Sequence, residues 1–141
     1  FTIDLQLKAI KPPVLHGDNG YSRKGQDPER ASCYYSFTRL QAAGILTVAG
    51  SRHRVQGLAW MDHEFSTAPL QPGITGWDWF SLQLSDNTEI MFFLLRTDSG
   101  GQHPASGGTF VDPGGRPTRL SSNHFQFAPA HAMLADAGCG M

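Results

Sequence analysis

The sequence predicts an all-β, antiparallel fold that is closed as a barrel or folded as a sandwich. Apolar and polar residues alternate at period two, turn-forming residues separate these segments, and helix propensity is confined to the end of the chain from Ala130. The 16 Gly and 9 Pro among 141 residues break helices and favour many short elements. With 40% hydrophobic residues, a chain of this length can fill the core of one domain.

The first nine residues predict the clearest strand. Phe1, Ile3, Leu5, Leu7 and Ala9 alternate with polar residues, which is the pattern of a half-buried strand. The segment Lys11-Pro12-Pro13 ends it. Residues 16–30 are polar and are predicted to form a long loop around Tyr21, and loops of this length are often functional.

Hairpin-type turns at Gly50-Ser51 and Asp86-Asn87 divide the rest of the chain into short strands, and a Pro-rich loop covers 66–73. The predicted strands are 33–40, 44–49, 53–62, 76–85, 88–96, 107–112, 117–121 and 124–127. We expect the hairpin of 76–85 and 88–96 to form the apolar centre. Its run Ile90 to Leu95 is the longest apolar stretch and is far shorter than the ~18–20 residues of a membrane span, so no span is expected.

Charge and cysteine content exclude several classes of protein. Lys and Arg number 11 and Asp and Glu 12, and the basic residues are scattered except at Arg52-His53-Arg54, so no nucleic-acid partner is expected. Cys33 and Cys139 form neither a disulfide framework nor a metal-spaced pair.

Two predicted strands carry tryptophans close to acidic residues. Because side chains alternate along a strand, the even-numbered residues of 58–64 share one face, opposite His63. In 76–85 the odd-numbered residues share one face, opposite Asp78. One face of each strand is expected to line a cavity, and the residues that carry this interpretation are Trp60, Asp62, Glu64, Trp77, Asp78 and Trp79.

Such a cavity suits a largely hydrocarbon ligand held by one or two polar anchors. An apolar site disfavours the charged form of a carboxyl group, which then acts as a general acid. Asp62 and Asp78 are the first candidates for this role, and Glu64 is the next. The alternative is structural: the tryptophans fill the core, and the two aspartates form turns or pair with Arg39 or Arg96.

A metal site is not expected. Asp62-His63-Glu64, with His16, Asp18 and His103, contains metal-ligand residue types. However, neighbouring residues of a strand point to opposite faces, and the His-Glu-x-x-His helix motif is absent from the sequence. We therefore expect neither a metal nor another cofactor.

Several segments also match the pattern of a known family. They include Trp60-Met61-Asp62-His63-Glu64-Phe65 and Gly76-Trp77-Asp78-Trp79-Phe80-Ser81. The remaining matches lie in 14–17, 20–25, 34–40, 55–59, 82–84, 89–91, 108–109 and 112–115. With these residues the chain resembles the lipocalin-like family of carotenoid 1,2-hydratase (hydroxyneurosporene synthase), and above all its bacterial secreted hydrolase-like branch.

The resemblance implies a lipocalin-like barrel or sandwich, normally two per chain of a few hundred residues. Residues 1–129 are then the lipocalin-like domain, and 130–141 form a tail outside the family pattern that is expected to be poorly ordered. The chain is accordingly expected to be a fragment of a two-barrel protein, with the second lipocalin-like domain as its partner. A periplasmic or secreted location follows if the chain behaves as its bacterial relatives do.

The resemblance also implies a chemistry. Named members hydrate a terminal double bond of a linear isoprenoid without a redox cofactor, and other relatives are pericyclic cyclases. The chain is therefore expected to bind a long isoprenoid- or polyketide-like molecule and to hydrate or cyclise it, with Asp62, Asp78 and Glu64 as catalytic residues. The expected ligand-binding residues are Trp60, His63, Trp77, Trp79, Tyr35, Arg39 and His16. The alternative is a non-catalytic hydrophobic-ligand carrier or scaffold.

Overall fold

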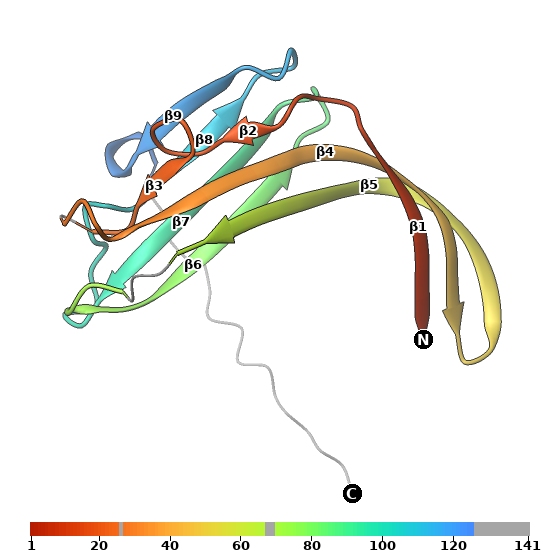
Figure 1. The fold of residues 1–141 in the computed structure, drawn as a ribbon, viewed down its shortest axis with the longest axis horizontal. Helices are drawn as coiled ribbons and strands as arrows, with labels where there is room; N and C mark the ends of the chain where they lie inside the picture. The colour runs from red at the N-terminus through yellow and green to blue at the C-terminus, as the bar shows by residue number, and fades with distance from the viewer. Residues whose placement is uncertain (26, 67–69, 126–141) are drawn as a thin grey trace, which may run out of the picture.

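The computed structural model describes residues 1–25, 27–66 and 70–125, which form two antiparallel β-sheets (Figure 1). The first sheet contains β1 (Thr2–Ala9), β2 (Val14–Leu15), β3 (Tyr21–Arg23), β4 (Ala31–Val48) and β5 (Ser51–Phe65). The second contains β6 (Ile74–Gln83), β7 (Glu89–Thr97), β8 (Gly107–Val111) and β9 (Pro117–Ser121), and a 3-10 helix, η1 (Ser122–His124), follows. The predicted all-β antiparallel fold is confirmed.

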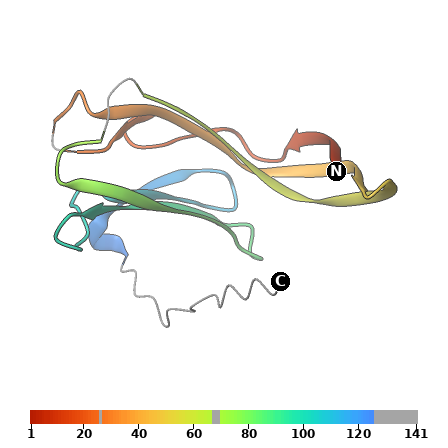
Figure 2. The same ribbon diagram turned by 90° about the horizontal axis from the view of Figure 1, so that it is seen from below.

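The long strand β4 organises the first sheet. It pairs with β5 along one edge and with β1, β2 and β3 along the other. The strands of the second sheet follow one another in sequence order, from β6 to β9. Figure 2 shows the two sheets stacked face to face, with β1 and the adjoining ends of β4 and β5 extending beyond the second sheet.

The core lies between the two sheets. Its buried cluster takes Tyr34 from β4, Ile74 from β6, and alternate residues of β7. The alternate residues of β7 are Met91, Phe93 and Leu95, so the expectation that this hairpin supplies the apolar centre is confirmed. In the part of the chain that the structure describes, no helix has the length and hydropathy needed to cross a membrane.

Three local predictions were wrong. The segments 33–40 and 44–49 are one continuous strand, β4, with a bulge between Phe37 and Leu40. The predicted loop 16–30 contains β3, which pairs with β4 and is too short for periodicity to detect. His124 closes the 3-10 helix and does not begin a strand, and residues 126–141 lie outside the described part of the chain, as does the predicted tail.

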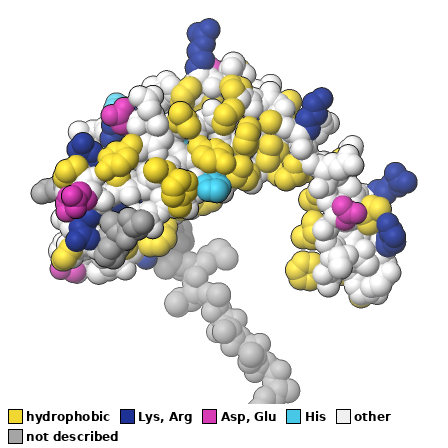
Figure 3. Space-filling view, viewed as in Figure 1, with side chains coloured by type: hydrophobic (Ala, Val, Ile, Leu, Met, Phe, Trp, Pro, Cys, Tyr) yellow, Lys and Arg dark blue, Asp and Glu magenta, His cyan; other side chains and the backbone are white. Residues whose placement is uncertain are grey.

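The apolar residues of β1 remain exposed. Ile3 is 59% exposed and Leu7 52%, so the strand that the alternation predicted is present without the predicted burial. Figure 3 shows hydrophobic side chains gathered on the visible face of the molecule and on the part that extends beyond the second sheet. The described residues thus leave a broad apolar surface uncovered.

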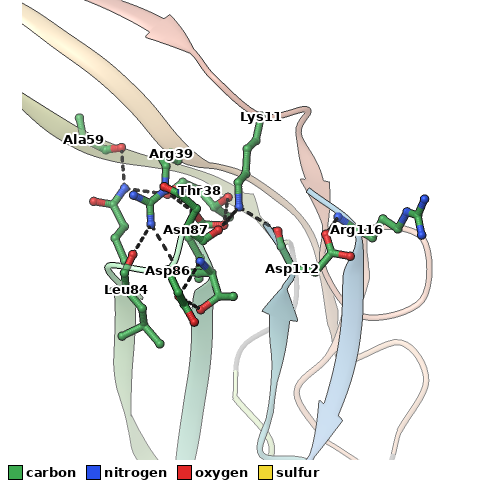
Figure 4. Close-up of polar contacts among 12 residues, drawn as sticks. Lys11, Thr38, Arg39, Ala59, Leu84, Asp86, Asn87, Asp112 and Arg116 are labelled. Carbon is green, nitrogen blue, oxygen red and sulfur yellow. Dashed lines mark hydrogen bonds and ion pairs between the residues drawn. The ribbon is translucent and has the colours of Figure 1, made fainter. Parts of the chain in front are cut away.

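A buried ion cluster joins the sheets at the end where β6 turns into β7 (Figure 4). Glu89 is fully buried, pairs with Lys11 at 2.8 Å, and also pairs with Arg39 from β4. In the turn itself, hydrogen bonds from the hydroxyl and backbone N–H of Thr88 lower the pKa of Asp86. The ion pairs of Glu89 fix the two sheets relative to each other, whereas the contacts between Thr88 and Asp86 stabilise the turn.

Candidate functional site

The site is built around the carboxylate of Asp62 on β5. Its Oδ1 atom accepts hydrogen bonds from the Tyr34 hydroxyl and the Trp60 indole N–H, both at 2.9 Å, and from the Ser36 hydroxyl. The register explains this convergence, since Ser36 pairs directly with Asp62 across β4 and β5. Inward-facing side chains of two neighbouring strands therefore meet at one carboxylate oxygen.

The second sheet reaches the same group through Trp79 on β6. The Trp79 indole N–H donates to the Tyr34 hydroxyl oxygen at 3.0 Å. Burial, and next the charge of Asp62, raise the pKa of Tyr34, so its hydroxyl stays protonated. The Tyr34 hydroxyl thus accepts a hydrogen bond from Trp79 of the second sheet and donates one to Asp62 of the first sheet.

His16, which follows β2, lies behind this carboxylate. Only 1% of the residue is exposed, and its Nε2 atom lies 2.7 Å from Ser36 Oγ, while Nδ1 lies 2.9 Å from Thr109 Oγ1 on β8. Burial is the main cause that lowers the pKa of His16, from 6.5 to about 4. The ring is therefore neutral at pH 7.

A cavity of about 320 Å³ lies next to these hydrogen-bonded residues and shares Trp79 with them, while Asp62 itself is not among the residues that line it. Its walls include Trp77, Trp79 and Phe93, while Lys24 and Glu64 supply charged groups. This volume lies at the low end of the ~300–1,000 Å³ of small-molecule sites, and the combination of apolar walls with few polar groups is typical of them. Of the three tryptophans expected to line a cavity, Trp77 and Trp79 do so and Trp60 does not.

The polar groups of this cavity form a compact set. Lys24 Nζ lies 2.8 Å from Glu64 Oε1 and 4.0 Å from the centre of the Phe93 ring. The Ser32 hydroxyl donates to the same Glu64 oxygen at 2.5 Å. Glu64 is thus ion-paired and hydrogen-bonded, and the lysine lies over an aromatic wall, where its charge is favoured by the ring. Sequence analysis missed Lys24, whose role depends on a loop that carries no periodic signal.

Sequence reasoning missed three further residues, Tyr34, Ser36 and Thr109. The alternation of β4 holds a signal for the first two, because Tyr34 and Ser36 share one face, opposite Tyr35. Choosing the correct face requires the register of Ser36 with Asp62, which sequence alone does not supply.

Of the residues predicted from sequence, the structure brings six to this region, namely Trp60, Asp62, Glu64, Trp77, Trp79 and His16. It places four elsewhere. Asp78 and Arg96 form an exposed ion pair on the other face of β6, and Arg39 belongs to the buried cluster with Glu89. Tyr35 and His63 stack on each other at 5.2 Å, on the side of the first sheet away from Asp62.

The surroundings of Asp62 differ from the closed apolar site that the sequence suggested. Its side chain is exposed in the described part of the chain, while Oδ1 is saturated by three donors. Within residues 1–25, 27–66 and 70–125, no group of three metal-ligating side chains comes together.

The family follows from comparison with known proteins. The AttH-like family pattern matches residues 1–138. The chain belongs to the AttH-like family. A crystal structure of an AttH from Nitrosomonas europaea is 34% identical, with a TM-score of 0.84 over 90% of this chain. No curated protein matches the sequence significantly.

A second solved structure, kievitone hydratase from Nectria haematococca, matches with a TM-score of 0.61 over 83% of this AttH-like chain. At 17% identity it shows the shared fold alone. The chain spans 39% of the Nitrosomonas protein and 36% of the hydratase. The expected relation to lipocalin-like hydratases is therefore confirmed for the fold, and the closer relation to carotenoid 1,2-hydratase stays a prediction.

Proposed function

We propose that this AttH-like chain binds a long hydrophobic molecule, isoprenoid- or polyketide-like, in the cavity beside Trp77 and Trp79. We further propose that Asp62 catalyses its cofactor-independent hydration or cyclisation. The observation that carries the proposal is the convergence of three donors on one oxygen of Asp62, next to an aromatic cavity between two sheets.

The two carboxylate oxygens of Asp62 have different surroundings and different roles in this proposal. Oδ1 is held by Ser36, Tyr34 and Trp60, whereas Oδ2 takes part in none of the hydrogen bonds among the described residues. Oδ2 is therefore the oxygen that meets a ligand. A fixed carboxyl group with one engaged and one open oxygen is suited to proton transfer along a defined direction.

In the proposed hydration, protonated Asp62 gives its proton to the less substituted carbon, the one that bears hydrogen, of a trisubstituted terminal double bond. The π electrons form the new C–H bond, and the tertiary cation left behind is stabilised by nearby indole faces. Water adds to the cation through oxygen and releases its surplus proton to the surrounding water, so Asp62 has to be protonated again for the next turnover. In the cyclisation variant an internal double bond attacks the same cation in place of water, and loss of a neighbouring proton completes the reaction.

A carrier without catalysis is the second candidate. The exposure of Asp62 favours it, because the general-acid mechanism expected from the sequence places this side chain in a closed apolar site. The uncovered apolar surface supports a further proposal about the parent protein. A second lipocalin-like domain, in the part of the AttH length that this chain does not span, covers the apolar face of β1.

The test compares Asp62→Asn with Asp78→Asn in the full-length parent protein. Asp78 is a matched control, because it is a carboxylate on the neighbouring sheet that faces away from the site. The probes are squalene and geranylgeraniol in isotopically labelled water, with products detected by mass spectrometry and binding by tryptophan fluorescence. We expect Asp62→Asn to lower turnover by about 10²–10⁴-fold, with little effect on binding. We expect Asp78→Asn to leave both turnover and binding unchanged.

Other outcomes separate the candidates. Full turnover by Asp62→Asn removes this residue from the mechanism. Binding of both probes without product in the wild type identifies a carrier. If neither probe changes the fluorescence of the wild type, the hydrophobic-ligand proposal is wrong.

A further inference from the structure

We infer that His16 and Ser36 form a proton relay to Asp62, in which His16 is the positioning residue and its tautomer is set by the charge of Asp62. The inference deepens the proposed function and rests on it, since it assigns a source to the proton that Asp62 transfers. The inference is argued from the directions of the hydrogen bonds that join His16, Ser36 and Asp62.

The direction of each hydrogen bond follows from the chemistry of the partners. A carboxylate only accepts, so the single proton of the Ser36 hydroxyl points at Asp62 Oδ1. Ser36 Oγ must then accept from His16 Nε2, 2.7 Å away, so this nitrogen carries the ring proton. A neutral ring leaves Nδ1 unprotonated, and it accepts from Thr109 Oγ1 at 2.9 Å.

The surroundings of His16 keep the ring neutral. The Tyr34 ring packs against it with centroids 4.3 Å apart, and the ring is almost fully buried. The charged groups that act on it are Asp62 and Glu64 of β5, which raise its pKa, and Lys24, which lowers it. Burial outweighs these charges, so the ring passes protons on without holding a charge.

The relay balances without any further reactant. A proton that enters at Thr109 Oγ1 displaces its hydroxyl proton onto His16 Nδ1, and Nε2 releases its own proton to Ser36 Oγ. Ser36 in turn releases its proton to Asp62 Oδ1, and a half-turn of the protonated carboxyl group exchanges its two oxygens and carries this proton to the ligand side. Each group of the relay thus gives one proton and receives one. His16 and Thr109 both line a second cavity of about 160 Å³, separate from the ligand cavity, where the proton enters.

The first test reads the tautomer directly by two-bond proton–nitrogen correlation spectra of the protein with labelled histidine. The His16 signals are assigned by their loss in His16→Gln. We expect the proton on Nε2 at neutral pH. Asp62→Ala removes the acceptor of Ser36, which then turns its proton toward the ring, so His16 shifts toward the Nδ1–H form. Asp62→Asn keeps an acceptor oxygen and retains the Nε2–H form.

The tautomer decides the inference and needs no ligand. An Nδ1–H ring in the wild type, or a tautomer that Asp62→Ala leaves unchanged, overturns the relay even if Asp62 proves to be catalytic. The linked tautomer in a protein that converts neither squalene nor geranylgeraniol upholds the relay geometry and refutes the proposed reaction.

Kinetics supply the second readout. Where turnover is measured, Ser36→Ala is expected to lower kcat by about 10-fold or more with little change in KM, because a relay acts on proton delivery and not on ligand binding. Ser36→Thr restores the hydroxyl and is expected to recover the rate. An unchanged kcat in Ser36→Ala overturns the relay.

Discussion

Glu89→Gln tests whether the buried ion cluster holds the two sheets together. Glu89 is fully buried, and the side chains of its partners Lys11 and Arg39 are only 7% and 8% exposed. Glutamine keeps the size of the side chain but removes its charge. The substitution therefore leaves two cations in the core opposite a neutral amide, with little change in packing.

The magnitude follows from the geometry. At the 2.8 Å that separates Glu89 from Lys11, and an effective dielectric constant of about 20, the gross attraction is about 6 kcal/mol. Desolvation of the charges offsets much of this attraction, and removal of one partner from a buried pair costs about 3–5 kcal/mol. For 141 residues the unfolding entropy is about 0.3 kcal/mol/K, so the expected fall in Tm is about 10–17 °C.

Thermal unfolding followed by circular dichroism measures this change. Asp78→Asn is the control, because its ion pair with Arg96 is exposed and contributes at most about 1 kcal/mol, or about 3 °C. Adding Lys11→Met to Glu89→Gln removes one of the unpaired cations and is expected to recover part of the loss. If Glu89→Gln lowers the Tm no more than Asp78→Asn does, the cluster does not stabilise the sandwich.

Two further predictions concern stability. The unfolded chain protonates His16 below pH 6.5, but the folded chain does so only near pH 4. The stability contributed by the neutral ring is thus complete above pH 6.5 and is lost as the pH falls toward 4, by up to about 3 kcal/mol. Urea unfolding at pH 7.5 and 4.5 is expected to show a smaller difference for His16→Gln than for the wild type, and an equal difference contradicts the assignment. Gly44→Ala places a Cβ atom 2.0 Å from the backbone oxygen of Asp4, so we expect faster hydrogen exchange of the β1 amides, whereas Gly57→Ala meets nothing within 4 Å and leaves exchange unchanged. If the β1 amides of Gly44→Ala exchange as slowly as those of the wild type, the prediction is wrong, because β1 then stays paired with β4.

Much of the fold was predictable because local patterns determine it. The alternation from Phe1 to Ala9 predicted β1, and the Asp86-Asn87 turn predicted the central hairpin. The break predicted between 33–40 and 44–49 was wrong, because β4 runs through it without interruption. In the structure Gly44 lies inside β4, where the backbone of β1 approaches too closely for any side chain.

The site was predictable where it depended on one strand at a time. The period of two correctly grouped Asp62 with Trp60 and Glu64, and Trp77 with Trp79. The period of two does not tell which of the neighbouring residues Tyr34 and Tyr35 belongs to the site. Their side chains are alike and point to opposite faces of the sheet. Only the pairing of β4 with β5 decides that choice, and pairing depends on contacts between distant parts of the chain.

The position of His16 shows why the chemistry of the site depends on the packing of both sheets. His16 and Thr109 are 93 residues apart in sequence, and their contact bridges the first sheet and the second. Burial between the sheets, which no local pattern encodes, keeps the ring neutral and thereby fixes the direction of its hydrogen bonds. If the sheets separate, the ring regains its ordinary pKa and Ser36 loses the partner that aims its proton at Asp62. The orientation of the catalytic candidate is therefore a property of the whole sandwich, not of the strand that carries it.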